Sequence, residues 1–141
     1  MKGDKELPSE YVSIRQIWLQ GINDCRTAIG QRAIQQATEE KEWRQIGDKT
    51  VIYTVEALYN SLVDYGEATV RSDVDHFYKE KHKPEINKIW DSDKSNENKL
   101  FRHGKASIKF YDFIIQTLNK YGMLFEQQPQ GYSNVEMRSI E

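Results

Sequence analysis

The chain has 141 residues, which suits a single domain with one hydrophobic core. Its 20 basic and 22 acidic residues leave a net charge of −2, which argues against a dedicated nucleic-acid-binding protein because such proteins usually carry a strong basic excess. Sixteen aromatic residues (8 Tyr, 5 Phe and 3 Trp) argue against a disordered chain.

The two ends of the chain differ in composition from its middle. Residues 1–8 are polar and end in Pro8, and the segment that follows residue 125 contains the sequence QQPQG. We therefore predict a flexible arm over 1–8, a single helical domain over 9–125 and a flexible tail over 126–141.

The first predicted helix is long. No proline and no cluster of turn residues occurs between Glu10 and Ile46, and apolar residues recur there at steps of three and four, as on one face of an α-helix. This stripe consists of Ile14, Trp18, Ile22, Cys25, Ile29, Ala33 and Ala37. A helix over 10–46 would be about 55 Å long. Gly21 and Gly30 lie inside it, and each marks either a close helix contact or a kink.

The pair Gly47-Asp48 predicts a helix stop followed by a restart. A second helix is expected from there to about Tyr65, with Val51, Val55, Leu58 and Leu62 on its apolar face. The β-branched run over 50–55 is also typical of a strand, but the helical period continues without a break through Leu62, which favours a helix. Gly66 is predicted to end it.

Two further helices are expected in the second half of the chain. Residues 67–71 are predicted to be a connector, and Ser72 with Asp75 resembles a capping box that starts the third helix. Pro84 falls inside that helix and predicts a kink or a break, because proline lacks the backbone donor. Ser95 or Asn96 is expected to cap a fourth helix that runs to about Tyr121, before Gly122.

These elements predict an all-α fold: a small bundle of four main helices with a long first helix. The apolar stripe of the first helix would be longer than the neighbouring helices can cover. Part of it would therefore stay exposed, and exposed apolar area favours association with another protein surface. We therefore predict self-association or docking of a protein partner through the first helix. The residues expected to bind the partner are Ile14, Trp18, Ile22, Ile29 and Ala33. The alternative is a kinked first helix that folds back on its own bundle.

The chain resembles a family of bacterial helical domains of unknown function in the order of its features. These are the long first helix, then Val74, Ile86 and Trp90, and then Arg102 and the sequence YDF over 111–113. The resemblance covers about two thirds of the chain and rests on spacing. Many members carry a membrane anchor before the long helix, and we expect none here. The resemblance supports a helical fold and implies no particular chemistry.

Arg71 and His76 form an Arg-x-x-x-x-His pattern that is similar to the motif of the HEPN ribonuclease group. The resemblance implies that Arg71 and His76, from paired subunits, would cleave RNA with the histidine as general acid and base, without a metal. In that group the motif usually opens the last helix, whereas here a long helix follows. The alternative is that both side chains lie on a solvated helix surface.

Four basic residues share one face of the fourth predicted helix. They are Lys99, Arg102, Lys105 and Lys109. This stripe is a candidate for contact with phosphates or nucleic acid, although it is also typical of the solvated side of an amphipathic helix.

Asp73, His76 and Glu80 lie on one helix face, but a di-metal bundle needs a second acid-x-x-His pair. We therefore predict no metal site, and no sequence motif indicates a cofactor.

A single cysteine, Cys25, excludes an internal disulfide and is typical of a reducing compartment. No apolar stretch is long enough to span a membrane or to act as a signal peptide. We therefore expect a cytoplasmic protein without membrane contact. The function favoured by the sequence is a non-enzymatic helical protein–protein interaction module. A HEPN-like ribonuclease and a nucleic-acid-binding helical protein are the alternatives.

Overall fold

The computed structural model describes residues 9–124, with side chains from residue 14 onward. The helices are α1 (Ser9–Gln36), α2 (Lys41–Tyr65), α3 (Ala68–Phe77), the π-helix η1 (Tyr78–His82), α4 (Lys83–Asp91) and α5 (Asn96–Lys120). No strand occurs over residues 9–124, so the helical prediction for 50–55 is confirmed. The arm predicted over 1–8 and the tail predicted over 126–141 lie outside the described residues.

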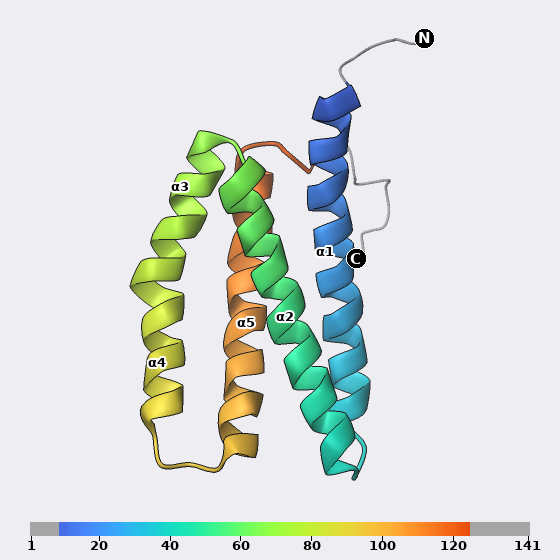
Figure 1. Cartoon of the computed structure of the whole chain (residues 1–141), viewed down its shortest axis with the longest axis vertical. Coiled ribbons are helices and arrows are strands. Elements are labelled where there is room, and N and C mark those ends of the chain that lie inside the picture. Colours follow the sequence, from blue (N-terminus) through green and yellow to red (C-terminus); the bar gives the residue numbers. More distant parts are fainter. Residues whose placement is uncertain (1–8, 125–141) are drawn as a thin grey trace.

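Four helical rods make up this all-α bundle, as Figure 1 shows, because α3, η1 and α4 follow one another without a break. The helix α1 packs against α2, and α2 packs against α5. The rod formed by α3, η1 and α4 covers the other side of α5. The predicted fold class, a small bundle of four main helices, is confirmed.

The hydrophobic core lies between these rods and takes side chains from each of them. Its members with at most 1% exposure are Cys25 of α1, Val55, Leu58 and Leu62 of α2, Val70 and Val74 of α3, and Phe110, Ile114 and Leu118 of α5, together with Val51. Burial of apolar area, at about 25 cal/mol per Å², is the main force that holds such a bundle together.

The predicted length of the first helix is wrong. The helix α1 ends at Gln36, and α2 already begins at Lys41. The turn between them contains neither glycine nor proline. Its carbonyls are satisfied by side chains instead: Thr38 Oγ1 donates to the carbonyl of Gln35 at 2.9 Å, and Arg44 Nη1 donates to the carbonyl of Thr38 at 2.8 Å. A helix can end on such local side-chain bonds.

Gly47 and Asp48 do not separate two helices, because both are buried inside α2. Gly47 lies where α2 meets α1: a Cβ atom there would lie 3.2 Å from Cα of Arg32. The glycine therefore permits close approach of the two backbones. Its position next to a polar residue imitates a stop signal in the sequence.

The helix α1 continues through Gly21 and Gly30, so neither glycine breaks it. A Cβ atom at Gly21 would lie 3.1 Å from Cδ1 of Leu58, whereas one at Gly30 would meet nothing within 4 Å. Gly21 therefore marks a close contact between α1 and α2. Of the two possibilities left by the sequence, contact is the right one for Gly21.

The capping box predicted at Ser72 and Asp75 is also wrong, because α3 begins at Ala68. Gly66 follows the last residue of α2 as predicted, and the backbone N–H of Gly66 donates to the carbonyl of Leu62. Only Gly66 and Glu67 separate the two helices, so the connector predicted over 67–71 is largely helical.

The helix is irregular at Pro84, as predicted, but it does not break: the irregularity is the π-helix η1 just before the proline, which lies in the first turn of α4. Pro84 cannot donate to the carbonyl of Glu80, so the preceding turn loses an α-helical bond. Val70 and Ile89 are both buried and lie 89 − 70 = 19 residues apart, whereas five α-helical turns hold about 18 residues. The wider π turn takes up the additional residue.

The two ends of α5 are as predicted. Ser95 Oγ accepts a 3.1 Å hydrogen bond from the backbone N–H of Asn98, which is the geometry of a helix N-cap. Gly122 follows the helix with φ of 72°, a left-handed conformation that favours glycine.

Candidate binding groove

The residues predicted to bind a partner through the first helix differ in exposure. Trp18 and Ile22 are buried against α2, and Ile14 and Ile29 are half-buried at the edge of the core. Ala33 is exposed. The large apolar side chains that α1 exposes within the described range are Ile17 and Ile34. Most of the predicted stripe is thus covered by α2, because α1 is shorter than predicted.

Three of the four residues in the basic stripe on α5 have a partner. Lys99 Nζ donates to the carbonyl of Trp90 at 3.1 Å, and Lys109 Nζ lies 3.4 Å from Glu85 Oε1. Lys105 lies over the ring of Phe101, while Arg102 is exposed. The basic charge of this face is therefore partly balanced by its own chain. Nucleic-acid binding stays a prediction.

Arg71 and His76 both lie exposed on α3. Arg71 Nη1 donates to the carbonyl of Gly66 at 3.4 Å, so the guanidinium covers the end of α2. Five residues along an α-helix correspond to a rotation of about 140°. The two side chains of one chain therefore do not converge. Their role in a HEPN-like ribonuclease stays a prediction.

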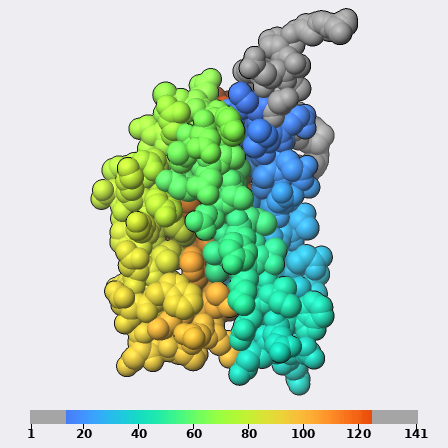
Figure 2. All heavy atoms as spheres, in the orientation of Figure 1, coloured from blue at the N-terminus to red at the C-terminus, as the bar shows by residue number. Residues whose placement is uncertain are grey.

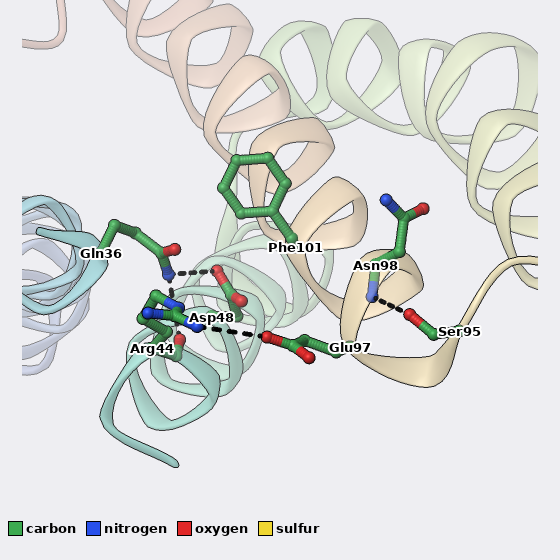
Figure 3. A pocket seen from close by; sticks show the side chains of 7 residues that line it. All are labelled: Gln36, Arg44, Asp48, Ser95, Glu97, Asn98 and Phe101. Atoms are coloured by element: carbon green, nitrogen blue, oxygen red, sulfur yellow. Dashed lines mark hydrogen bonds and ion pairs between the residues drawn. The ribbon is translucent and has the colours of Figure 1, made fainter. Parts of the chain in front are cut away.

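Figure 3 shows a polar depression where the C-terminal part of α1 meets the first turns of α2 and α5. Its volume is about 310 Å³. Asp48 accepts hydrogen bonds from Arg32 Nε at 2.8 Å and from Gln36 Nε2 at 3.1 Å. Burial raises the pKa of Asp48, and the bond from Arg32 opposes this rise. The pair joins α1 to α2 deep below the surface.

At the rim of the same depression, Glu97 of α5 lies 3.5 Å from Nη2 of Arg44 and 3.4 Å from Nζ of Lys41. The guanidinium of Arg32 also donates to the carbonyl of Phe101 at 3.3 Å. The charged groups here thus bind one another across three helices. Because these ions already have partners, and removal of one would leave a buried charge unpaired, we interpret the depression as a structural junction of α1, α2 and α5.

Two further hollows follow one another along the region between α2 and α4. In Figure 2, atoms of α5 are visible at the bottom of this region, between the atoms of α4 and those of α2. We call it the α2–α4 groove. Its lining residues are Gln45, Lys49, Ile52, Val55, Glu56 and Tyr59 of α2, Tyr78 and His82 of η1, Lys83, Ile86, Asn87 and Trp90 of α4, and Asn96, Glu97, Leu100, His103 and Phe110 of α5.

One end of the groove is an aromatic cavity beside η1. The ring of Tyr59 stacks on that of Tyr78 with centroids 4.4 Å apart, and His82 stacks on Phe110 at 4.6 Å. Tyr59 Oη also donates to Asp75 Oδ1 at 2.6 Å, which fixes the ring against α3. The cavity has a volume of about 200 Å³, so it can enclose a group about the size of a single ring.

Burial lowers the pKa of His82 to about 4, and the neighbouring His103 contributes to this shift. Burial also lowers the pKa of His103. Trp90 Nε1 donates to His103 Nδ1 at 3.1 Å, so Nδ1 accepts and the proton of this neutral imidazole resides on Nε2. Near neutral pH both rings are therefore uncharged, and the cavity is an apolar space with hydrogen-bonding edges.

The other end of the groove is shallower and centres on Trp90. Gln45 and Lys49 of α2 and Leu100 of α5 line this hollow together with Trp90. Trp90 is 38% exposed although the helical period places it on an apolar face. The exposed indole therefore offers apolar area that the chain itself does not cover.

Sequence patterns did not indicate a site at His82, His103 and Trp90. A straight helix that starts from Val70 would turn Lys81 inward after three turns, because three turns hold about 11 residues. The π turn shifts the register and brings His82 to the core instead. Pro84 was the available signal, since it marked where the helix departs from regular geometry.

Over residues 9–124, no group of three His, Cys, Asp or Glu side chains is arranged to hold a metal ion. None of the helices in that range combines the length and apolar character that a membrane span requires. Comparisons of the chain with protein-family models, with curated proteins and with solved structures gave no match. The two family resemblances of the sequence therefore stay predictions, and function has to be argued from the groove itself.

Proposed function

We propose that the protein is a non-enzymatic helical interaction module that docks a partner protein beside the α2–α4 groove. The observation that carries this proposal is the exposure of two large apolar side chains on one face of α2: Tyr53 is 70% exposed and Ile46 is 46% exposed. Two helical turns separate them, so they lie above one another on the surface.

Trp90 extends this face across the groove. Lys49 lies between Ile46 and Tyr53 along α2 and lines the hollow that Trp90 also lines. We call Ile46, Lys49, Tyr53 and Trp90 the docking surface. Tyrosine and tryptophan are enriched at the centres of protein interfaces, because they bury a large area and lose little conformational entropy.

The partner that this surface suits is an amphipathic helix. Such a helix would rest its apolar side on Tyr53 and Trp90 and place acidic residues near Lys49. The stretch of α2 from Ile46 to Tyr53 is about 10 Å long, and each apolar Å² buried contributes about 25 cal/mol. The sequence pattern predicted that the partner docks on α1, but Trp18 and Ile22 are buried there, which favours docking on α2 and α4 instead.

A cytoplasmic location is part of the proposal. It rests on the single cysteine, Cys25, which is buried and unpaired. A reducing compartment is the ordinary environment of such a thiol.

Site-specific photocrosslinking in cells tests the docking surface. A photoreactive phenylalanine analogue at Tyr53 should give a discrete crosslinked protein, and the Ile46→Asp substitution in the same chain should abolish it. The same analogue at Ile34, which is 63% exposed on α1, is the matched control and should give no such product. Equal crosslinking from both positions, or none from Tyr53, would refute the proposal. Light scattering across a concentration series distinguishes a second copy of the chain from a different partner.

A further inference from the structure

The aromatic cavity beside η1 has the dimensions of a single ring. It encloses about 200 Å³ between α2, η1 with α4, and α5, and a cavity of about 150 Å³ in another protein holds benzene. Tyr59, Tyr78 and Phe110 supply flat aromatic surfaces, and Ile52 and Ile86 supply apolar ones. The rings of Tyr59 and Tyr78 are tilted by 53° and 43° relative to the ring of Phe110, and tilted aromatic walls favour an aromatic ligand through edge-to-face contacts.

His82 provides a polar group inside this space. It is only 9% exposed and lines the cavity. No hydrogen bond joins its imidazole to another residue in the described part of the chain, whereas the side chains of Tyr59 and His103 both have partners. The ring nitrogens of His82, which have no partner, are not fully covered by other atoms, so they keep accessible surface toward the cavity. The imidazole therefore offers a hydrogen-bonding position that a ligand in the cavity can reach.

The π turn is the reason that a histidine occupies this position. The additional residue in the turn rotates Lys81 to the surface and His82 inward. π turns within helices are found frequently at functional sites. Here the π turn and an imidazole that lacks a protein partner occur at the same residue, where a ligand in the cavity can bond to His82.

The charges at the cavity mouth do not favour an ionic ligand. Glu56 and Lys83 both line it, and their charges are opposite. We propose that this cavity binds a small neutral aromatic molecule with one hydroxyl or ring N–H group, which packs against the tyrosine and phenylalanine rings and forms a hydrogen bond with His82. This binding does not depend on the docking of a partner protein, because the docking surface lies at the outer face of α2 and at Trp90.

Titration of the full-length protein with three probes tests the chemistry of the site. The first probe is p-cresol. The second, toluene, lacks the hydroxyl group, and the third, 4-methylcyclohexanol, lacks the planar ring. We expect saturable binding of p-cresol in chemical-shift titrations at pH 7, with the largest shifts at the amides of His82, His103 and Phe110. Toluene should bind about tenfold more weakly, since a factor of ten corresponds to about one net hydrogen bond. 4-Methylcyclohexanol keeps the hydroxyl group but should also bind more weakly, because it lacks the aromatic contacts of p-cresol.

Two variants test the role of His82. His82→Leu keeps an apolar side chain of similar size and should weaken p-cresol binding to the level of toluene. His76→Leu changes an exposed histidine on the same rod and should leave binding unchanged. The wild-type comparison of p-cresol with toluene needs no variant, so it remains decisive if His82→Leu fails to fold. The proposal is overturned by absence of saturable binding, by equal affinity for p-cresol and either other probe, or by unchanged p-cresol affinity in folded His82→Leu.

Discussion

The Nε atom of Arg32 donates a 2.8 Å hydrogen bond to Oδ1 of Asp48, and both side chains are buried where α1, α2 and α5 meet. Gln36 donates a second hydrogen bond to the same carboxylate oxygen, and the carbonyl of Phe101 accepts one from Arg32. The ion pair therefore connects the three helices through one set of polar bonds.

Removal of one partner from this pair should strongly destabilise the fold. The Asp48→Ala substitution leaves the Arg32 charge buried without a counter-ion, which costs about 3–5 kcal/mol in comparable buried pairs. Urea denaturation at pH 7 measures the loss. The control is Lys109→Ala, which removes an exposed ion pair with Glu85 and should cost about 1 kcal/mol or less. Equal losses in the two variants would contradict a structural role for the buried pair.

Two glycines inside helices should respond to the same substitution with opposite signs. At Gly104 a Cβ atom would lie 3.1 Å from Arg32 Nε and 3.2 Å from Asp48 Oδ1, so Gly104→Ala should lower stability by displacing the ion pair. At Gly30 a Cβ atom would meet nothing within 4 Å, so Gly30→Ala should raise stability by about 0.5–1 kcal/mol through its higher helix propensity. Thermal unfolding of both variants measures the difference, and a gain from Gly104→Ala would be inconsistent with the tight contact.

The fold class could be predicted from the sequence because apolar periodicity depends only on local spacing. The positions of Ser95 and Gly122 also gave the ends of α5 correctly, since caps act within one turn. The turn between α1 and α2 could not be predicted in the same way. It depends on side-chain bonds from Thr38 and Arg44, and the glycine that resembled a stop, Gly47, serves a contact between helices.

The candidate sites were harder to predict than the fold. A helical wheel for a straight helix assigns Lys81 to the interior, so the aromatic cavity with His82 is invisible until the π turn is known. Tyr53 and Ile46 stand out only when the neighbours of α2 are known, because exposure is a property of the packed bundle. Helix pairing, which joins residues distant in the sequence, is the information that periodicity does not contain.

The thiol of Cys25 should be unreactive in the folded protein. Its side chain is fully buried, and burial raises its pKa to about 12. Because the thiolate is the reactive species, we expect no labelling by an aromatic disulfide reagent at pH 8 in buffer and rapid labelling of one thiol in urea. The labelling rate in intermediate urea then reports opening between α1 and α2. Immediate labelling in buffer would show that this part of the core is open.

The stability of the protein should fall as the pH decreases from 7 to 5, and His82 should be a principal cause. Burial, together with the nearby His103 and Lys109, lowers the folded-state pKa of His82 to about 4, while Glu85 opposes the shift. The unfolded chain has an ordinary histidine pKa of about 6.5. Between these values the unfolded state binds more protons than the folded state, so stability is lost as the pH falls through this window.

The expected loss between pH 7 and pH 5 is about 2 kcal/mol from His82 alone, by the linkage of proton binding to folding. Urea denaturation at both pH values measures it in the wild type and in His82→Leu, where only the smaller contribution of His103, whose pKa is also lowered, should remain. His76→Leu removes an exposed imidazole and should keep the wild-type dependence. If His82→Leu loses as much stability as the wild type over this range, His82 does not remain neutral inside the folded protein, and the cavity beside η1 is wetter than its burial indicates.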